Sequence, residues 1–560
     1  MKRICKLLSV LLAFVLLFCA CHTDPAATGT TETTVEKTSA RTEPTQSDTA
    51  ALTTDETTEP VTSGSEEPVP IDLGGYAVSS STKEATAAGM KILNQGGNAV
   101  DAAVAVALAL GVTEPYSSGL GGSGVMVVYD PVKDSGHSLD YYACAGSAAK
   151  SDDCVGVPGF LAGMQEALDR WGTMSLREVI EPAIDLAENG FPATALFARR
   201  LTYSAKLQQN KAFANVREGD KVVQTELAET LKLIRDQGSA VFYTGQIAQD
   251  IADACELDLM DLAAYKVNYY SALRSRFNGV RIYSTTAPTS GVVTSEMLTA
   301  ADLMDVPDPR EDPDGYLKVM KLATQIGYNT RRTKLVDPRF YDFDGKQLVS
   351  RKYVKKLVKK AQEDSSLMIE PDPERRCTTQ FAVIDRQGMI VCVTNTLSDN
   401  WGGYIYVDGF YLNNTLGNFN QTGKNAYEPY KRPRTHFSPV LCIGDDGYRL
   451  AIGSPGGDAI PKVVSQVLID VLKFDVDLQS AVDTARYYFD DDGLLCLETV
   501  DEGNTSRIDL SQINCRYYYS SSHVSFGCTA IVGYDPEEGI IAVSDLRRDG
   551  SDSQIATVGN

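Results

Sequence analysis

The run from Ala102 to Leu110 limits the fold more than any other stretch, because every residue in it is apolar and most are small. Such a run predicts a helix that is buried on all sides, since it leaves no polar face for water. It is too short to cross a membrane. A chain of 560 residues is long enough to bury such a helix in a large core.

Segments on both sides of this helix predict antiparallel sheets covered by helices, and therefore an α+β fold. Four strand pairs with short turns are expected, at 125–129 with 138–142, 381–385 with 389–394, 439–443 with 448–452, and 529–534 with 540–544. Helices are expected at 83–93, at 176–189 with a kink at Pro182, and at 460–474, with a mainly helical, polar middle up to about Glu363.

The N-terminus predicts export. Lys2, Arg3 and Lys6 precede the apolar run 7–18, which ends at Cys19-Ala20-Cys21. This pattern indicates a signal peptide at 1–20 and a lipid on Cys21, which would hold the protein on the extracellular face of a bacterial membrane; a plain secretory signal is the alternative. Residues 22–70 hold ten acidic residues against two basic ones and few large apolar side chains, so 21–70 is expected to be a disordered tether.

Charge and cysteine spacing exclude other classes of protein. The net charge of −22 argues against a nucleic-acid partner, which would require a basic face. Nine of the twelve cysteines lie beyond Cys21, and none has the spacing of a zinc site. Cys144 and Cys154 are the nearest candidates for a disulfide. Nothing in the sequence calls for a metal or an organic cofactor.

Thr378 and Thr379 stand where a charged segment ends and a run of strand-forming residues begins. The ordinary interpretation is a loop that enters an edge strand. The other interpretation makes Thr378 a new N-terminus and the nucleophile of a hydrolase. The α-amine of an N-terminal threonine titrates near pH 8 and can serve as the base for its own hydroxyl, so no triad histidine is needed.

Motifs along the chain favour the second interpretation. They are Gly96-Gly-Asn-Ala-Val-Asp-Ala-Ala-Val, Ser117-Ser-Gly-Leu-Gly-Gly-Ser-Gly, Val157-Pro-Gly-Phe-Leu-Ala-Gly, Asp185-Leu-Ala-Glu-Asn-Gly-Phe-Pro, Ala287-Pro-Thr-Ser-Gly, Thr378-Thr, Lys431-Arg-Pro, Gly453-Ser-Pro-Gly-Gly and Ser544-Asp-Leu-Arg-Arg-Asp-Gly. In type and order these motifs resemble the gamma-glutamyltransferase (gamma-glutamyltranspeptidase, glutathione hydrolase) family over nearly all of residues 75–550.

The resemblance implies a four-layer αββα sandwich of the N-terminal nucleophile hydrolases, with mainly antiparallel sheets. It implies self-cleavage between Cys377 and Thr378, which gives a large part (71–377) and a small part (378–560) that remain associated in one intertwined body. Thr378 would be the nucleophile and Thr396 the threonine that holds its hydroxyl. Gly456 and Gly457 would supply the backbone N–H groups of an oxyanion hole.

The substrate clamp departs from the family pattern. Tyr142 stands where the family has the arginine that binds the substrate α-carboxylate, and a tyrosine cannot form a bidentate charged bond with it. Asn418 stands in place of the acid that holds the substrate ammonium, and Ser398 in place of an asparagine. Thr435 and His436 replace a Ser-Ser pair. For His436, packing in the core is favoured over contact with substrate.

These observations predict an extracellular, self-cleaving hydrolase or transpeptidase that acts on γ-glutamyl or related amides, such as glutathione-like peptides. The rewritten clamp leaves two alternatives open. One is an acylase or transpeptidase with a non-glutamyl substrate, and the other is a non-catalytic surface lipoprotein that keeps the fold as a binding module.

Overall fold

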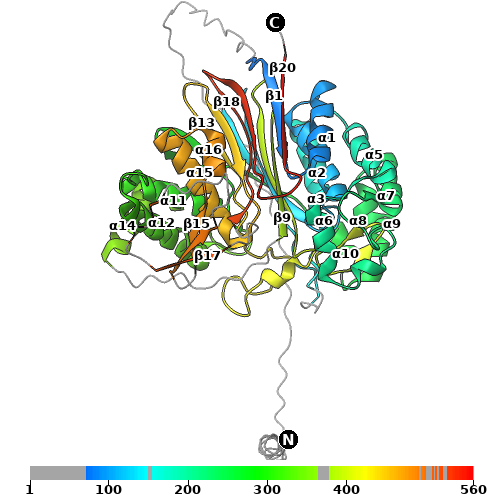
Figure 1. Ribbon diagram of the computed structural model, residues 1–560. Coiled ribbons are helices and arrows are strands. Elements are labelled where there is room, and N and C mark those ends of the chain that lie inside the picture. Colours follow the sequence, from blue (N-terminus) through cyan, green and yellow to red (C-terminus); the bar gives the residue numbers. More distant parts are fainter. Residues whose placement is uncertain are drawn as a thin grey trace, which may run out of the picture. The chain divides into compact units, whose positions relative to one another are not determined.

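The computed structural model describes residues 71–148, 154–363 and 377–490 and most of 493–558. The predicted signal peptide, Cys21 and the predicted tether lie outside these residues. Figure 1 shows two stacked sheets between two groups of helices, which is the predicted αββα arrangement.

The first sheet has seven strands in the order β20-β1-β9-β10-β2-β3-β6, and all neighbours are antiparallel. Its strands are β1 (Gly75–Ser80), β2 (Ser123–Asp130), β3 (Ser135–Tyr141), β6 (Asn268–Ser271), β9 (Cys377–Ile384), β10 (Ile390–Ser398) and β20 (Asp552–Thr557). Strands β9 and β10 follow the predicted cleavage point, yet they lie in the middle of this sheet, between β1 and β2.

The second sheet has six antiparallel strands in the order β19-β18-β14-β13-β8-β7. They are β7 (Leu273–Phe277), β8 (Val280–Ser284), β13 (Val440–Ile443), β14 (Arg449–Gly453), β18 (Ala530–Asp535) and β19 (Gly539–Ser544). Smaller pairings join β4 (Phe191–Pro192) to β5 (Lys221–Val222), β11 (Tyr406–Val407) to β12 (Phe410–Tyr411), and β15 (Tyr487–Phe489) through β16 (Leu495–Glu498) to β17 (Tyr517–Ser520).

One group of helices covers the seven-stranded sheet on the right of Figure 1. It comprises α1 (Lys83–Asn94), α2 (Ala99–Thr113), α3 (Phe160–Trp171), α4 (Leu176–Val179), α5 (Glu181–Asn189), α6 (Ala195–Arg200), α7 (Thr225–Gln237), α8 (Ala240–Thr244), α9 (Gln246–Ala254) and α10 (Leu259–Ala263). The other group covers the six-stranded sheet and comprises α11 (Gly291–Leu303), α12 (Pro313–Lys334), α13 (Gly345–Leu348), α14 (Arg351–Glu363), α15 (Ile460–Phe474) and α16 (Leu478–Asp483).

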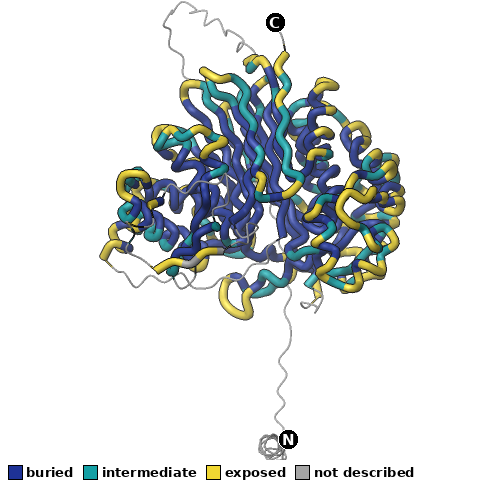
Figure 2. Tube along the Cα trace, in the orientation of Figure 1, coloured by how far each residue is buried: buried dark blue, intermediate teal, exposed yellow. Residues whose placement is uncertain are grey.

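Three apolar cores follow from these layers: one between each sheet and its helices, and one between the sheets. Figure 2 shows the sheet centres and the inner helices as continuously buried. Helix α2 is the innermost helix of the first group. All its residues except Gly111 are buried, as the apolar run predicts. None of the helices in the described part of the chain is long and apolar enough to span a bilayer.

Two expectations from the sequence are wrong. The stretch 176–189 is not one kinked helix but two, α4 and α5, because the helix breaks at Ile180 and α5 begins at Glu181 with Pro182 in its first turn. The polar middle is mainly helical, as predicted, and it also supplies β6, β7 and β8. Cys144 is a buried thiol and does not form a disulfide with Cys154.

Candidate active site

Thr378 is the second residue of β9 and lies directly opposite Thr396 on β10. It is only 4% exposed. After Thr396 the pairing slips at a bulge, so that Ser398 rather than Leu397 lies opposite Cys377. Ser398 has a positive φ of 80°, a conformation that costs energy for a side chain other than glycine. Both sides of the predicted cleavage point therefore face residues 396–398.

The Thr396 hydroxyl is held in one orientation. It accepts a hydrogen bond from the Ser398 N–H at 2.7 Å and donates one to the carbonyl oxygen of Cys377. That carbonyl belongs to the peptide bond that joins Cys377 to Thr378. A hydroxyl that donates to this oxygen polarises the carbonyl toward attack.

The Cys377 side chain is anchored by its surroundings. Its Sγ lies 3.0 Å from the Tyr116 carbonyl oxygen and 3.1 Å from both the Asn400 side-chain oxygen and the Ser117 hydroxyl, so the single S–H proton has several acceptors. Burial raises the pKa of this thiol. Cys377 is therefore a neutral, well-packed residue on the N-terminal side of the bond.

A buried ion pair holds the other side of the bond. Arg548 donates from Nε and Nη2 to the two carboxylate oxygens of Glu114, both at 2.8 Å, and from Nη1 to the Thr378 carbonyl at 2.7 Å. Glu114 also accepts from the Thr379 hydroxyl at 2.6 Å. The Glu114 carboxylate raises the pKa of Arg548 against the opposing effect of burial, so the guanidinium stays charged.

Sequence reasoning assigned no role to Glu114 or Arg548. A signal was present in the sequence, because Glu114 lies three residues before the motif that begins at Ser117, and Arg548 lies within Ser544-Asp-Leu-Arg-Arg-Asp-Gly. A buried charge in a motif calls for a partner.

Gly456 and Gly457 follow the end of β14 and precede α15. Both have positive φ, 133° and 59°, which side chains rarely adopt. The Tyr328 hydroxyl of α12 donates to the carbonyl of Asp458, the next residue, and so fixes this turn. Strand β14 packs against β9, where a Cβ on Gly453 would lie 2.3 Å from the Gln380 side chain. The two glycines therefore follow a strand, β14, that packs against β9, the strand that carries Thr378.

Three of the predicted substrate-binding residues form one hydrogen-bonded cluster. The Asn418 side-chain N–H₂ group donates to the Tyr142 hydroxyl at 3.0 Å and to the Ser398 hydroxyl at 3.2 Å. Tyr142 is completely buried and packs edge-on against Phe437 at 5.4 Å between ring centroids. All three side chains are neutral, and Ser398 places the cluster next to the Cys377–Thr378 bond.

Thr435 and His436 immediately precede Phe437, the residue that packs against Tyr142 of this cluster. Thr435 is anchored through its backbone, which donates to Pro288 and accepts from Ser290. His436 is buried, and its ring packs on Tyr328 at 5.9 Å. The packing interpretation of His436 fits this position, and contact of either residue with substrate stays a prediction.

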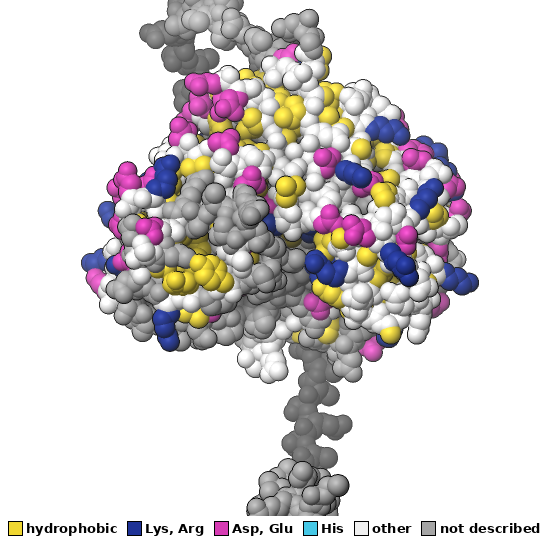
Figure 3. All heavy atoms as spheres, viewed as in Figure 1, with side chains coloured by type: hydrophobic (Ala, Val, Ile, Leu, Met, Phe, Trp, Pro, Cys, Tyr) yellow, Lys and Arg dark blue, Asp and Glu magenta, His cyan; other side chains and the backbone are white. Residues whose placement is uncertain are grey.

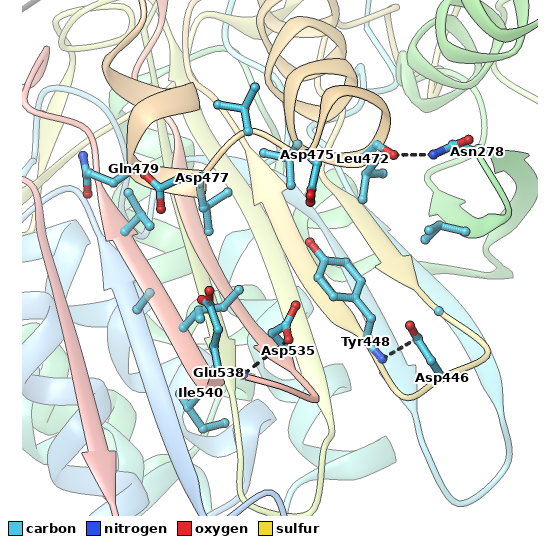
Figure 4. Close-up of a pocket in the computed structure, with 18 of the residues that line it drawn as sticks. Asn278, Asp446, Tyr448, Leu472, Asp475, Asp477, Gln479, Asp535, Glu538 and Ile540 are labelled. Atoms are coloured by element: carbon cyan, nitrogen blue, oxygen red, sulfur yellow. Dashed lines mark hydrogen bonds between the residues drawn. The ribbon is translucent and has the colours of Figure 1, made fainter.

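A cavity of about 960 Å³ lies elsewhere, lined by turns of the six-stranded sheet and by the end of α15. Figure 4 shows Tyr448 at its centre with Asp475, Asp535 and Glu538 around it. Figure 3 shows acidic side chains gathered at the upper left of the molecule. Tyr448 precedes β14 and Gly453 ends it, so this cavity and the Gly456-Gly457 turn lie at opposite ends of one strand.

Comparison with known proteins gives consistent matches. The sequence pattern of the family described as gamma-glutamyltranspeptidase matches residues 85–555. The capsule biosynthesis protein CapD proenzyme of Bacillus anthracis is 33% identical over 477 residues, 83% of this chain and 88% of that protein. The glutathione hydrolase proenzyme of Bacillus subtilis is 31% identical over 529 residues, 83% of this chain and 89% of that protein.

Among solved structures, the cephalosporin acylase from Bacillus halodurans matches with a TM-score of 0.73 and 24% identity, over 90% of this chain and 99% of that one. At this identity the match supports the fold alone.

Proposed function

The chain belongs to the gamma-glutamyltranspeptidase family of enzymes, and from this premise we propose that it cuts itself before Thr378 and then uses Thr378 to hydrolyse or transfer acyl groups from amides. The names of its relatives, glutathione hydrolase and capsule biosynthesis proenzymes, favour γ-linked glutamyl amides or related compounds as substrates and a proenzyme as the first product.

Self-cleavage needs only groups that surround the bond. The Thr378 hydroxyl attacks the Cys377 carbonyl, the C–N bond breaks, and the acyl group moves to Oγ1 while the nitrogen takes up a proton. Water then hydrolyses this ester, which releases the Cys377 carboxylate and leaves Thr378 with a free α-amine and a free hydroxyl. In the uncleaved chain, Thr396 polarises the attacked carbonyl and Arg548 fixes the carbonyl of the attacking residue.

The mature enzyme would repeat the same steps on a substrate amide. The Thr378 α-amine takes the hydroxyl proton as the hydroxyl attacks, and returns a proton to the leaving amine. N–H groups of Gly456 and Gly457 would stabilise the oxyanion, a contribution of about 10²–10³ in kcat for each donor. Water then gives hydrolysis, and a second amine gives transfer.

The single observation that carries this proposal is the hydrogen bond from Thr396 to the carbonyl of Cys377, directly across the strand pair from Thr378. Denaturing gel electrophoresis and N-terminal sequencing of the purified protein test it. We expect two chains, the smaller beginning at Thr378, and a single chain for Thr378→Ala. A wild-type protein that stays whole and inactive would favour the alternative of a non-catalytic binding module.

The Tyr142, Asn418 and Ser398 cluster favours an acyl group without the paired charges of a free γ-glutamyl group. Those charges would need charged partners when buried, and the cluster offers neutral ones. We therefore expect an anilide of a neutral or singly charged acyl group to be cleaved with a higher kcat/KM than the γ-glutamyl anilide. A panel in which the γ-glutamyl anilide dominates would contradict this part of the proposal.

The location of the enzyme is a separate proposal. We propose that Cys21 carries lipid after removal of residues 1–20, which would hold the enzyme on the outer face of a bacterial membrane. Metabolic labelling with a fatty-acid analogue tests this, with Cys21→Ser as the variant that should lose the label and be released.

A further inference from the structure

Helix α14 carries a run of lysines that the proposed chemistry does not use. It spans Arg351–Glu363, with the sequence Arg-Lys-Tyr-Val-Lys-Lys-Leu-Val-Lys-Lys-Ala-Gln-Glu. In Figure 1 it lies at the left edge of the molecule, among the helices that cover the six-stranded sheet. Its one acidic residue is the last, Glu363. The whole chain has a net charge of −22, so the composition of this helix is opposite to that of the rest of the protein.

The two faces of α14 differ in character. Val354, Val358 and Ala361 recur at helical spacing, are buried, and belong to the core between the six-stranded sheet and its helices. The period of 3.6 residues places the lysines of the helix on the opposite face. All five are exposed: Lys352, Lys355, Lys356, Lys359 and Lys360. We call these five residues the lysine stripe.

The lysine stripe lacks the ion pairs that lysines form on other helices of the protein. Lys232 of α7, Lys318 of α12 and Lys473 of α15 each lie within 2.8 Å of a carboxylate oxygen. In the lysine stripe, Lys359 lies 3.9 Å from Glu363. For the other four ammonium groups the structure records no ion pair with any described residue. The positive charge of this face is therefore available to a partner.

The spacing within the lysine stripe favours a bound counter-charge. Lysines three or four residues apart on a helix repel one another, as do Lys352 and Lys356, or Lys355 and Lys359. An anionic partner would relieve this repulsion. The stripe extends about 12 Å along the helix, at 1.5 Å per residue. A row of charges along one side of a helix matches an extended anionic surface, whereas a small anion would need donors that converge in a pocket.

We propose that the lysine stripe of α14 docks on the anionic phospholipid headgroups of a membrane. Exposed lysines clustered on an amphipathic helix are attracted to such a surface. The apolar face of α14 is buried in the protein, so the helix cannot insert into the bilayer and the contact is electrostatic. It acts within about 8 Å of the headgroups at physiological ionic strength.

Docking would set how the enzyme faces the membrane. A flexible chain of about 50 residues, the length of the tether predicted at 21–70, spans about 40 Å on average. A lipid on Cys21 would therefore keep the enzyme near the bilayer without orienting it. The lysine stripe would add the second contact and turn the acidic surface away from the anionic lipid. The inference takes the membrane from the proposed location, but it requires neither self-cleavage nor catalysis.

Binding to vesicles tests the contact on protein that carries no lipid. The chain from residue 21 onward with Cys21→Ser keeps every described helix and strand, since all of them lie beyond residue 70. The vesicles consist of phosphatidylcholine alone, or of phosphatidylcholine and phosphatidylglycerol in equal amounts. At low salt we expect roughly tenfold tighter binding to the anionic vesicles, and at high salt the loss of this preference.

Substitutions in α14 locate the contact. The triple variant Lys352→Gln, Lys355→Gln, Lys356→Gln should bind anionic vesicles no more tightly than neutral ones. Glutamine and lysine have similar helix propensities, so the melting temperature should stay close to that of the unsubstituted protein. The triple variant Lys352→Arg, Lys355→Arg, Lys356→Arg keeps the charge and should retain the preference for anionic vesicles.

A matched control removes the same charge from other elements. Lys91, Lys206 and Lys211 are exposed, and the triple variant Lys91→Gln, Lys206→Gln, Lys211→Gln should still prefer anionic vesicles. Equal binding to the two kinds of vesicle, or an equal loss in the two glutamine variants, would overturn the inference. Binding of soluble polyphosphate through the lysine stripe, without binding to anionic vesicles, would also overturn it and indicate a soluble polyanion as the partner.

Discussion

Arg548 donates a hydrogen bond to the carbonyl oxygen of Thr378 at 2.7 Å, although the two residues are 170 positions apart in the chain. Arg548 lies between β19 and β20, near the C-terminus, so folding of the last strands has to precede full assembly of the cleavage site. The arrangement would make the proposed self-cleavage depend on completion of the fold.

Removal of the Arg548 guanidinium should therefore affect both stability and cleavage. In Arg548→Gln the Glu114 carboxylate stays buried without its partner, and we expect the free energy of unfolding to fall by about 3–5 kcal/mol. Glu114→Gln with Arg548→Gln should recover most of this loss but still cleave slowly. Denaturant unfolding and the time course of two-chain formation measure the two effects. If the double variant cleaved itself at the wild-type rate, the hydrogen bond from Arg548 to the Thr378 carbonyl would be dispensable for cleavage.

The hydroxyl of Thr396 should matter to cleavage more than its bulk does. Thr396→Val keeps the shape but loses the donor to the Cys377 carbonyl, and we expect self-cleavage to slow by about 10²-fold. Thr394→Val on the same strand is the matched control, because its hydroxyl donates to Gln380 rather than to the bond. Pulse-labelled precursor, followed on gels, gives both rates. Similar slowing in the two variants would assign the effect to packing.

A negative charge at Asn418 should restore part of the ammonium clamp. In Asn418→Asp, the Tyr142 and Ser398 hydroxyls can donate to the new carboxylate, which is then available to a substrate ammonium. We expect kcat/KM for a γ-glutamyl anilide to rise roughly tenfold, the effect of one charged hydrogen bond. The kcat/KM for an anilide whose acyl group lacks the α-amino group should not rise. Asn420→Asp, whose side chain contacts Arg434 instead, is the control.

Stability should depend on pH through Asp408. Burial and the Asp250 carboxyl raise the pKa of Asp408 from 3.8 to about 6. Because the folded-state pKa is the higher one, this carboxyl favours the folded state most below pH 3.8 and loses that contribution as the pH rises through about 6. In the variant Asp408→Asn, the new side-chain amide can donate a hydrogen bond to the Asp250 carboxylate at any pH.

We expect Asp408→Asn and wild type to melt at the same temperature at pH 4. At pH 7.5 the variant should melt about 1–2 °C higher, a small effect because Asp408 is partly exposed. Thermal scans at several pH values measure the difference. If the difference in melting temperature between Asp408→Asn and wild type stayed constant from pH 4 to pH 7.5, the carboxyls of Asp408 and Asp250 would not share a proton.

Local patterns in the sequence predicted the central elements well. Helix α2 and the hairpins β2–β3, β9–β10, β13–β14 and β18–β19 were predictable because their apolar residues form long runs with clear turns. Strands β6 and β7 were missed because exposed polar side chains alternate in them, as in Leu273-Arg-Ser-Arg-Phe277. Their partners in the sheets, not their own composition, make them strands.

The candidate site, like the fold, was predicted from the sequence only in part. Thr378, Thr396 and the Tyr142, Asn418 and Ser398 cluster could be brought to one site by motif, and the structure places these residues together. The ion pair between Glu114 and Arg548 joins residues 434 positions apart. No periodicity relates them, so only the folded chain brings this contact into view.

Strands β9 and β10 lie between β1 and β2, and this position changes what self-cleavage would mean for the molecule. The cut would free one chain end in a strand pair whose two outer neighbours, β1 and β2, both belong to the other part. Before the cut, folding is a unimolecular process that protein concentration does not affect. After it, unfolding would release two chains, and recovery would require a bimolecular encounter that slows on dilution. An enzyme matured in this way would therefore refold more slowly as its concentration falls.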